Sequence, residues 1–322
     1  MNVRPVAAAL VAAGLVAGAT LPDVGAPPTR RGSWIVIEAD FHVHSFTADG
    51  AQSPLGLMLQ ARRHGLHAFA MTNHSRLFAS RFGRWLSHAV GGPTIVLGEE
   101  ITAPDYHLVG LGLSRRVRWR QPAAAAIDSI HAQGGLAIAA HPTERSWRDR
   151  APATLARLDG AEVMQSVGLE SRRAGMELRD FRRALLAARP GAAAVASSDH
   201  HWLDDLGVCR TYVFVRANTE REILEAVRAG RTVARDVDGR LVGEPALVAV
   251  LETQPLGAPG VSSDYGYHAA SSVRAVARAA GWIGLVGLLL CAPTPRRSRP
   301  RGVSGTASST DYTDSNSDEG EG

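Results

Sequence analysis

Short apolar runs alternate with longer amphipathic segments through most of the chain. The apolar runs occupy residues 34–37, 68–71, 94–97, 108–111, 136–139, 161–164 and 192–196. Runs of this length with polar residues at their ends predict strands that are buried on both faces. Segments with helical spacing lie between them, at residues 54–64, 122–133, 178–188 and 220–229. This alternation predicts an α/β fold with a parallel barrel, in which the carboxyl ends of the strands meet at one mouth.

Histidines and carboxylates gather at the ends of these apolar runs. The positions are Asp40, His42, His44, His74, Glu99, Glu100, His107, His141, Asp199, His200 and His201. His42 and His44 are two residues apart, so on a strand their side chains leave the same face and can bind one ion. Taken singly, each position is equally compatible with a buried side chain that has its own hydrogen-bond partner. Because they fall together at one predicted mouth, they predict a metal cluster.

His107 differs from the other positions because it precedes its apolar run. Glu100 and His107 are therefore expected to flank a hairpin that turns through Ala103-Pro104-Asp105. Asp199 and His201 repeat the two-residue spacing and combine an oxygen ligand with a nitrogen ligand. No G-x-S-x-G motif is present, which argues against a serine hydrolase.

Composition leaves room for one large domain and its appendages. The chain has 322 residues, of which 45% are hydrophobic, and a barrel of about 220 residues would use most of it. The net charge of +4 does not favour a nucleic-acid-binding surface. Cys209 and Cys291 are the only cysteines, and their positions do not favour a structural disulfide.

Both ends of the chain have the pattern of targeting or membrane segments. Arg4 precedes an apolar run from Val6 to Ala19, which is typical of a signal peptide, with an uncleaved anchor or a buried helix as the alternatives. Residues 273–293 predict a transmembrane helix, because they approach the length of a bilayer core and a cluster of arginines follows them. The alternative is a buried or surface helix, since the uncharged stretch within it, residues 279–292, is short for a bilayer.

The predicted domain organisation has five parts. They are a signal or anchor segment with a linker at 1–33, the barrel at 34–252, a linker at 253–272, the transmembrane helix at 273–293, and a basic cluster with an acidic tail at 294–322. The tail has too few apolar residues to offset the entropy of ordering it. We expect the barrel to lie outside the cytoplasmic membrane, either anchored to it or secreted.

Six polar motifs follow one another between Trp34 and Val242. They are Asp40-Phe41-His42-Val43-His44-Ser45 with Asp49-Gly50, Thr72-Asn73-His74, Gly98-Glu99-Glu100-Ile101, His107-Leu108-Val109-Gly110-Leu111-Gly112, Ala140-His141-Pro142 and Ser198-Asp199-His200-His201. In content and order they resemble the PHP (polymerase and histidinol phosphatase) family, as does a closing segment at residues 206–232. The resemblance implies a distorted seven-stranded β/α barrel whose mouth holds up to three metal ions.

The resemblance also implies how the ligands divide among the ions. In the family pattern three ions are held in turn by His42, His44, Glu100 and Asp199; by Glu100, His107 and His141; and by Asp49, His74 and His201. Asn73 stands where many members have Asp, which implies the loss of a carboxylate that orients or charges the third position. Imidazole and carboxylate ligands without thiolates favour two to three Zn, Mn or Fe ions over Ca or Mg.

The expected activity is hydrolysis of a phosphomonoester or phosphodiester by a metal-bound hydroxide, because clustered divalent ions activate water and neutralise phosphoryl charge. Arg76, Arg145 and Arg148 are candidates to bind the phosphate, and His200 is a candidate proton donor to the leaving oxygen. An equally simple interpretation makes them solvated charges and a loop neighbour. The alternatives are an amide or lactone hydrolase and a non-catalytic metal-binding module, toward which Asn73 is the one sequence hint.

The expected partners are a small phosphorylated substrate and, through the C-terminal helix, the membrane. Two predicted loops, residues 76–92 and 143–150, carry aromatic and basic side chains and are the candidates to select the substrate. Their aromatic residues are equally compatible with packing against the barrel rim.

Overall fold

The computed structural model describes residues 5–11, 27–165, 171–202, 206–256, 281, 283 and 284. The chain divides into one unit at Ala19–Val273 and another made of Met1–Gly18 with Arg274–Gly322. In the latter unit, residues 5–11 are helical. Among the described residues, no helix has the length and apolar character needed to cross a membrane. Most of the predicted transmembrane segment, residues 273–293, lies outside the described residues.

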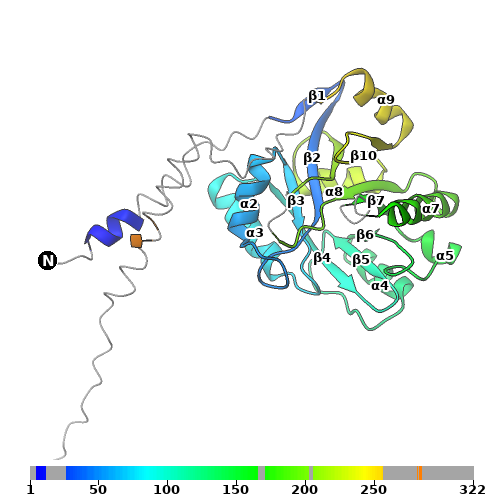
Figure 1. Cartoon of the computed structure of the whole chain (residues 1–322), viewed down its shortest axis with the longest axis horizontal. Helices are drawn as coiled ribbons and strands as arrows, with labels where there is room; N and C mark the ends of the chain where they lie inside the picture. Colours follow the sequence, from blue (N-terminus) through cyan, green and yellow to red (C-terminus); the bar gives the residue numbers. More distant parts are fainter. Residues whose placement is uncertain are drawn as a thin grey trace, which may run out of the picture. The chain divides into compact units, whose positions relative to one another are not determined.

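The unit at Ala19–Val273 contains one large sheet with helices packed along it (Figure 1). Its strands are β1 (Thr29–Arg31), β2 (Trp34–Val43), β3 (Ala68–Met71), β4 (Thr94–Thr102), β5 (His107–Leu111), β6 (Leu136–Ala139), β7 (Gly160–Gln165), β8 (Ala193–Ser197), β9 (Arg210–Val215), β10 (Thr232–Arg235) and β11 (Leu241–Gly243). Its helices are α2 (Pro54–Arg63), α3 (Phe78–Val90), α4 (Ala123–His131), α5 (Pro152–Leu155), α7 (Arg172–Ala188), α8 (Glu220–Arg228) and α9 (Pro245–Thr253).

The sheet curls until its two ends nearly meet. Its strands follow in the order β11-β10-β9-β2-β3-β4-β5-β6-β7-β8, with β1 paired to β2. Strand β8 returns to β9, because Thr211 Oγ1 accepts a hydrogen bond from Ala196 N at 2.9 Å and donates one to Ala196 O at 2.8 Å. Just past β8, His200 forms an isolated parallel bridge with Val43 of β2. The predicted α/β class with a barrel-like sheet is therefore confirmed.

The strand directions differ from those of the parallel barrel that the alternation of apolar runs and amphipathic segments predicts. Strand β5 is antiparallel to both β4 and β6, and β9 is antiparallel to β2. The pairs β2/β3, β3/β4, β6/β7 and β7/β8 are parallel. Residues 103–106 are too short a connection for a crossover, so β5 can only return beside β4 as a hairpin. That hairpin is the one predicted between Glu100 and His107, and Thr102 pairs with His107 at its closed end.

Helix α3 corrects the prediction of a substrate-selecting loop at residues 76–92. It covers Phe78–Val90 and ends at Gly91, which adopts the left-handed conformation with φ 65°. Phe78, Phe82 and Trp85 lie at helical spacing, and their rings stack at centroid distances of 6.1 and 5.8 Å. This spacing was available in the sequence as a helix signal.

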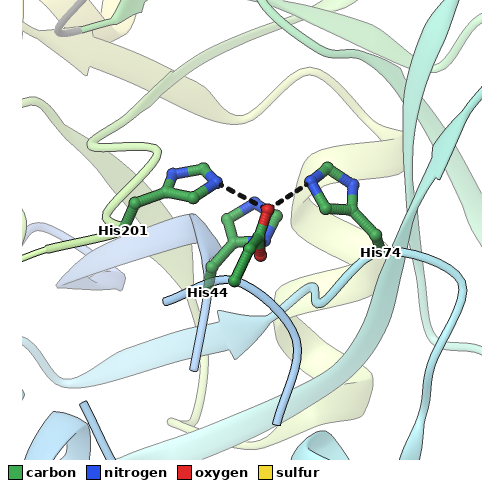
Figure 2. Close-up of side chains that lie close together, drawn as sticks. His44, His74 and His201 are labelled. Carbon is green, nitrogen blue, oxygen red and sulfur yellow. Dashed lines mark ion pairs between the residues drawn. The ribbon is translucent and has the colours of Figure 1, made fainter. Parts of the chain in front are cut away.

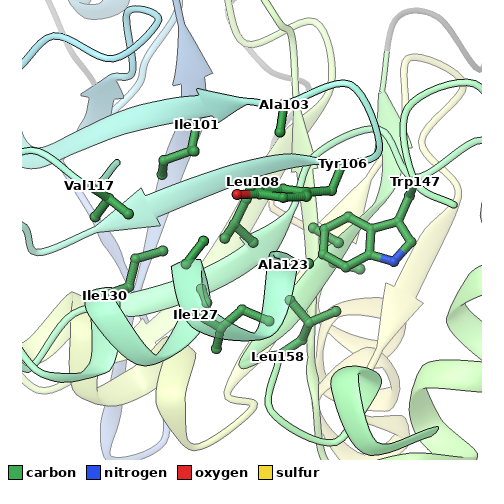
Figure 3. Packing of buried hydrophobic residues seen from close by; sticks show 14 of the residues in the cluster. Ile101, Ala103, Tyr106, Leu108, Val117, Ala123, Ile127, Ile130, Trp147 and Leu158 are labelled. Carbon is green, nitrogen blue, oxygen red and sulfur yellow. The ribbon is translucent and has the colours of Figure 1, made fainter. Parts of the chain in front are cut away.

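A large part of the core lies between strands β4 to β6 and helix α4 (Figure 3). Trp147 is fully buried there, and its ring meets Tyr106 and Phe181 edge-on at 6.0 and 5.6 Å. The aromatic residue of the predicted loop at 143–150 is therefore a core residue. This packing fixes the strands whose ends carry the predicted ligands.

Candidate metal centre

The nine predicted metal ligands form one connected cluster at a single end of the sheet. His42 and Glu100 lie near the ends of β2 and β4, and His107 opens β5. The remaining ligands lie in the loops that follow β2, β3, β6 and β8, and they are His44, Asp49, His74, His141, Asp199 and His201. Because β5 is antiparallel to its neighbours, its first residue lies beside the last residues of β4 and β6. Strand direction thus explains why His107 precedes its apolar run.

Glu100 is the centre of the cluster and is 1% exposed. Its Oε1 atom lies 3.1 Å from Nδ1 of His107 and 3.3 Å from Nε2 of His141. Its Oε2 atom lies 2.9 Å from Nδ1 of His74, 3.3 Å from Nε2 of His42 and 3.4 Å from Nε2 of His44. The two oxygens therefore face different sets of imidazoles, so Glu100 would be placed to bridge two cations if both were bound.

A second group surrounds Asp49, in the loop after β2. Figure 2 shows His44, His74 and His201 directed toward one carboxylate. Asp49 Oδ2 lies 2.9 Å from Nε2 of His74 and 3.3 Å from Nε2 of His201, while Oδ1 lies 3.2 Å from Nδ1 of His44. Thr102 Oγ1 lies 2.7 Å from Nδ1 of His74 and helps to fix that ring.

Asp199 lies between the imidazoles of His42 and His44 on one side and that of His141 on the other. Its Oδ1 atom is 3.3 Å from Nε2 of both His42 and His44, and its Oδ2 atom is 3.9 Å from Nε2 of His141. Gln165, on β7, donates a hydrogen bond from Nε2 to the same Oδ2 at 2.9 Å. Sequence reasoning did not single out Gln165, because it follows an apolar run without any chemical motif.

The donor atoms fit divalent metal ions. Several buried ligand atoms have no hydrogen-bond partner, and these are His42 Nε2, both ring nitrogens of His44, Glu100 Oε1, His107 Nδ1 and Asp199 Oδ1. Three sets of side chains bring one ligand atom each within 4.8 Å of one another: His44, Asp49, His74 and His201; His42, Glu100 and His141; and His42, His44 and Asp199. Buried lone pairs without donors are satisfied by a cation, so the residues present fit the metals that the sequence predicts.

Burial and neighbouring charges shift the pKa values of His42, Glu100 and Asp49 in the cluster. Burial by itself lowers the pKa of His42, but Asp199, Glu162 and Glu100 raise it well above its ordinary value. Burial by itself raises the pKa of Glu100, but the surrounding imidazoles bring it well below its usual range. The pKa of Asp49 is lowered, chiefly by the imidazole of His44 beside it. The carboxylates therefore favour a positive charge at this site, which a proton or a divalent cation can supply.

Backbone strain is concentrated at the same place. Among the described residues, Ser75, His141 and Asp199 are the non-glycine residues with positive φ, at 48°, 28° and 51°. His141 and Asp199 are predicted ligands, and Ser75 follows His74. Non-glycine residues held in this region cost about 1–3 kcal/mol each and are found where function requires an exact geometry.

Two buried carboxylates outside the predicted ligand set support the cluster. Glu162 of β7 lies 2.8 Å from Nδ1 of His42, within a run that the sequence shows as apolar except for this one charge. Asp40 accepts hydrogen bonds from Ser198 Oγ at 2.6 Å and from Gly207 N at 2.9 Å, which ties β2 to the loop after β8. Burial raises the pKa of Asp40 to about 6.

Asn73 positions the loop that carries Asp49. Its Oδ1 accepts a hydrogen bond from Ser45 N at 2.7 Å, so its Nδ2 faces Ser45 Oγ and Thr47 Oγ1 at 2.8 and 2.7 Å. Asn73 is fully buried. Asn in place of Asp at position 73 therefore leaves out a negative charge near His74, while the contacts of the side chain with Ser45 and Thr47 hold the loop.

The predicted substrate-binding residues have different surroundings. Arg76 is exposed and donates a hydrogen bond from Nη1 to Thr47 O at 2.6 Å, beside the loop of Asp49. Arg145 is exposed and lines a hollow of about 240 Å³ with Thr143 and Ser171. His200 is buried, and its Nε2 lies 3.3 Å from Nε2 of Gln52.

Known proteins resemble the chain in both sequence and fold. A family model described as PHP-associated matches residues 181–232. The structure is similar to that of a two-domain protein from Bacteroides vulgatus that contains a predicted PHP-like metal-dependent phosphoesterase, with a TM-score of 0.59, 19% identity, and coverage of 72% of this chain and 74% of that one. An uncharacterized protein of Methanocaldococcus jannaschii is 26% identical over 117 residues, which cover 33% of this chain and 68% of that protein.

The family match falls on the segment from α7 to β10, and the shared barrel covers most of the unit that holds the cluster. The sequence match covers residues 181–232, and the likeness of fold extends over 72% of the chain. The chain is thus similar to PHP-associated proteins in the sequence of this segment, and to a protein containing a predicted PHP-like metal-dependent phosphoesterase in fold.

Proposed function

We propose that the chain is a metal-dependent phosphoesterase that acts on a small phosphorylated molecule. The match to the PHP-associated family model and the clustered His, Asp and Glu side chains support the broader class, a metal-dependent hydrolase. The more specific proposal is that the substrate is a phosphoester. It is supported by the spacing of the ligand groups around the carboxylate of Glu100.

The observation that carries the proposal is the bridging position of Glu100. One oxygen faces His107 and His141, and the other faces His42, His44 and His74. Adjacent cation sites that share a carboxylate suit the displacement of one oxygen from phosphorus by another, because both oxygens develop charge. Two to three Zn, Mn or Fe ions remain the proposed cofactors.

Bound divalent ions would supply activation of water and neutralisation of phosphoryl charge. The chain's own side chains would orient the ester. Arg76 and Arg145 are exposed, so their guanidinium groups can meet a phosphate from solvent. His200 is fully buried beside Gln52, a position better suited to holding the mouth loops than to meeting a leaving group. We therefore favour the two arginines over His200 as substrate-binding groups.

The proposed location is outside the cytoplasmic membrane. It rests on the apolar runs at Val6 to Ala19 and at residues 273–293 and on the arginines that follow the second run. Fusion of a periplasm-dependent reporter after residue 256 tests it. Reporter activity supports export, and its absence contradicts it.

The activity is tested on the unit Ala19–Val273. Metal content is measured by elemental analysis, and turnover is measured with an aryl phosphomonoester and an aryl phosphodiester before and after chelation and after Mn or Zn is returned. We expect two to three metals per chain and turnover that chelation abolishes and metal restores. Turnover only of amides or lactones would support the other hydrolase class, and metal without any turnover would support a non-catalytic module.

Two adjacent variants make the test specific. Glu100→Gln removes the bridging carboxylate, and we expect it to lose metal and turnover together. Glu99→Gln is the matched control, because Glu99 is also buried on β4 but binds the backbone N of Val117 at 2.5 Å instead of the ligand cluster. Equal losses in both variants would contradict the assignment of Glu100.

A further inference from the structure

Glu162 is a buried carboxylate that is not among the nine predicted metal ligands. It lies on β7 and is 1% exposed. Its Oε1 atom lies 2.8 Å from Nδ1 of His42, and its Oε2 atom accepts a hydrogen bond from the backbone N of His141 at 2.7 Å. The carboxylate therefore joins two candidate ligands that are carried by different strands, β2 and β6.

The contact with His42 determines which ring nitrogen can bind a metal. When Nδ1 carries a proton and donates it to Glu162, the lone pair of the ring is on Nε2. That Nε2 atom faces Glu100 and Asp199, each at 3.3 Å. The contact thus fixes the orientation of the ring and leaves the correct nitrogen available.

The contact with His141 holds a strained backbone. His141 has φ 28°, a conformation that side chains other than glycine rarely adopt. The hydrogen bond from its backbone N to Glu162 supports this conformation, in which Nε2 of His141 lies 3.3 Å from Glu100 Oε1. Without the acceptor, the buried N–H would have to find another partner or move.

We propose that Glu162 is a positioning residue that orients His42 and His141 so that they bind one divalent cation together with Glu100. His42, Glu100 and His141 form one of the groups whose ligand atoms lie within 4.8 Å of one another. The proposal rests on the metal-binding part of the proposed function and is independent of the substrate.

A glutamine cannot replace Glu162 in both contacts. Both partners are N–H donors, so position 162 needs two acceptor oxygens. A carboxylate has two, whereas an amide has one oxygen and one NH₂ group, which faces a second donor. Glu162→Gln therefore keeps the size of the side chain and loses one of its two hydrogen bonds.

The test compares the full chain with Glu162→Gln and with Glu99→Gln, whose side chain is equally buried but does not touch a ligand. Metal-free protein is titrated with Co²⁺ and followed by its visible absorption, and the melting temperature of the metal-free form is recorded in parallel. We expect Glu162→Gln to bind one of the cations about 10- to 100-fold more weakly, with a changed Co²⁺ spectrum. We expect Glu99→Gln to have the wild-type affinity and spectrum.

An unchanged affinity and spectrum in Glu162→Gln would overturn the proposal, as would an equal loss in Glu99→Gln. If Glu162→Gln does not fold, the wild-type protein still decides. Nitrogen-15 NMR of the histidine rings in the Zn²⁺-bound chain should show His42 protonated at Nδ1 and bound through Nε2. Binding through Nδ1 would refute the proposed role. Because no substrate is used, failure here is distinct from failure of the phosphoesterase assay.

Discussion

Glu99, next to Glu100 on β4, allows a quantitative test of how a buried carboxyl group changes the stability of the protein with pH. Its side chain is fully buried, and one oxygen accepts a hydrogen bond from Val117 N at 2.5 Å, while Oε2 has no hydrogen-bond partner. Burial raises the pKa of Glu99 to about 7, although Val117 and Arg116 oppose this. The perturbation is Glu99→Gln, which keeps the shape and removes the titration.

The expected magnitude follows from the two pKa values of the carboxyl group. The folded protein holds the proton with a pKa of about 7, against 4.5 in the unfolded chain. The folded form therefore binds more protons between these values, and the free energy of unfolding falls as pH rises through that window. The difference is worth about 3 kcal/mol at most, of which about 2.5 kcal/mol falls between about pH 5 and pH 8. Glu99→Gln abolishes this loss.

Urea unfolding of both proteins at pH 5, 6, 7 and 8, with a chelator present, measures the effect. The stability of Glu99→Gln relative to the wild type should increase by about 2–3 kcal/mol across this range. A difference in the free energy of unfolding that is the same at every pH reflects the hydrogen bonds of the amide and says nothing about the pKa of Glu99. A relative stability that is independent of pH would refute it, because Glu99 would then have its ordinary pKa in the folded protein.

Three further substitutions test the arrangement of the site and its support. Asn73→Asp restores a carboxylate beside His74, so calorimetric titration with Mn²⁺ should show about tenfold tighter binding at one site, and unchanged or weaker binding would contradict this charge effect. Gly50→Ala places a Cβ 2.4 Å from His44 O, so the backbone must move and Co²⁺ binding to the group of Asp49 should weaken; wild-type affinity would show that the loop tolerates the shift. Trp147→Ala should lower the free energy of unfolding by about 3–5 kcal/mol in a urea titration, and a loss below about 1 kcal/mol would place Trp147 outside the core.

Much of the site could be predicted because its spacing is local. The separation of His42 from His44, and of Asp199 from His201, places each pair on one face of an extended segment. The apolar runs that precede these residues predict where strands end, and ends of parallel strands meet at one edge. The structure brings all these residues into one cluster for that reason.

Helix α3 and the strand directions were predicted less well. Residues 76–92 contain aromatic and basic residues, which suggested a binding loop, although Phe78, Phe82 and Trp85 have helical spacing. The antiparallel direction of β9 has no signal in its own residues, because its partner β2 lies far away in the sequence. Sheet pairing of this kind depends on the connections and not on the strand itself.

The sequence by itself determined the α/β class, the residues that form the cluster of His, Asp and Glu side chains, and the hairpin between Glu100 and His107. Each of these depends on spacing within a few residues or on a motif. The tertiary structure alone decided that Glu162 contacts His42 across 120 positions, and that Asn73 holds a loop 28 positions earlier in the chain. Contacts of this kind leave no local pattern, because a buried carboxylate or amide acquires its role from whichever donors the fold brings within hydrogen-bond distance.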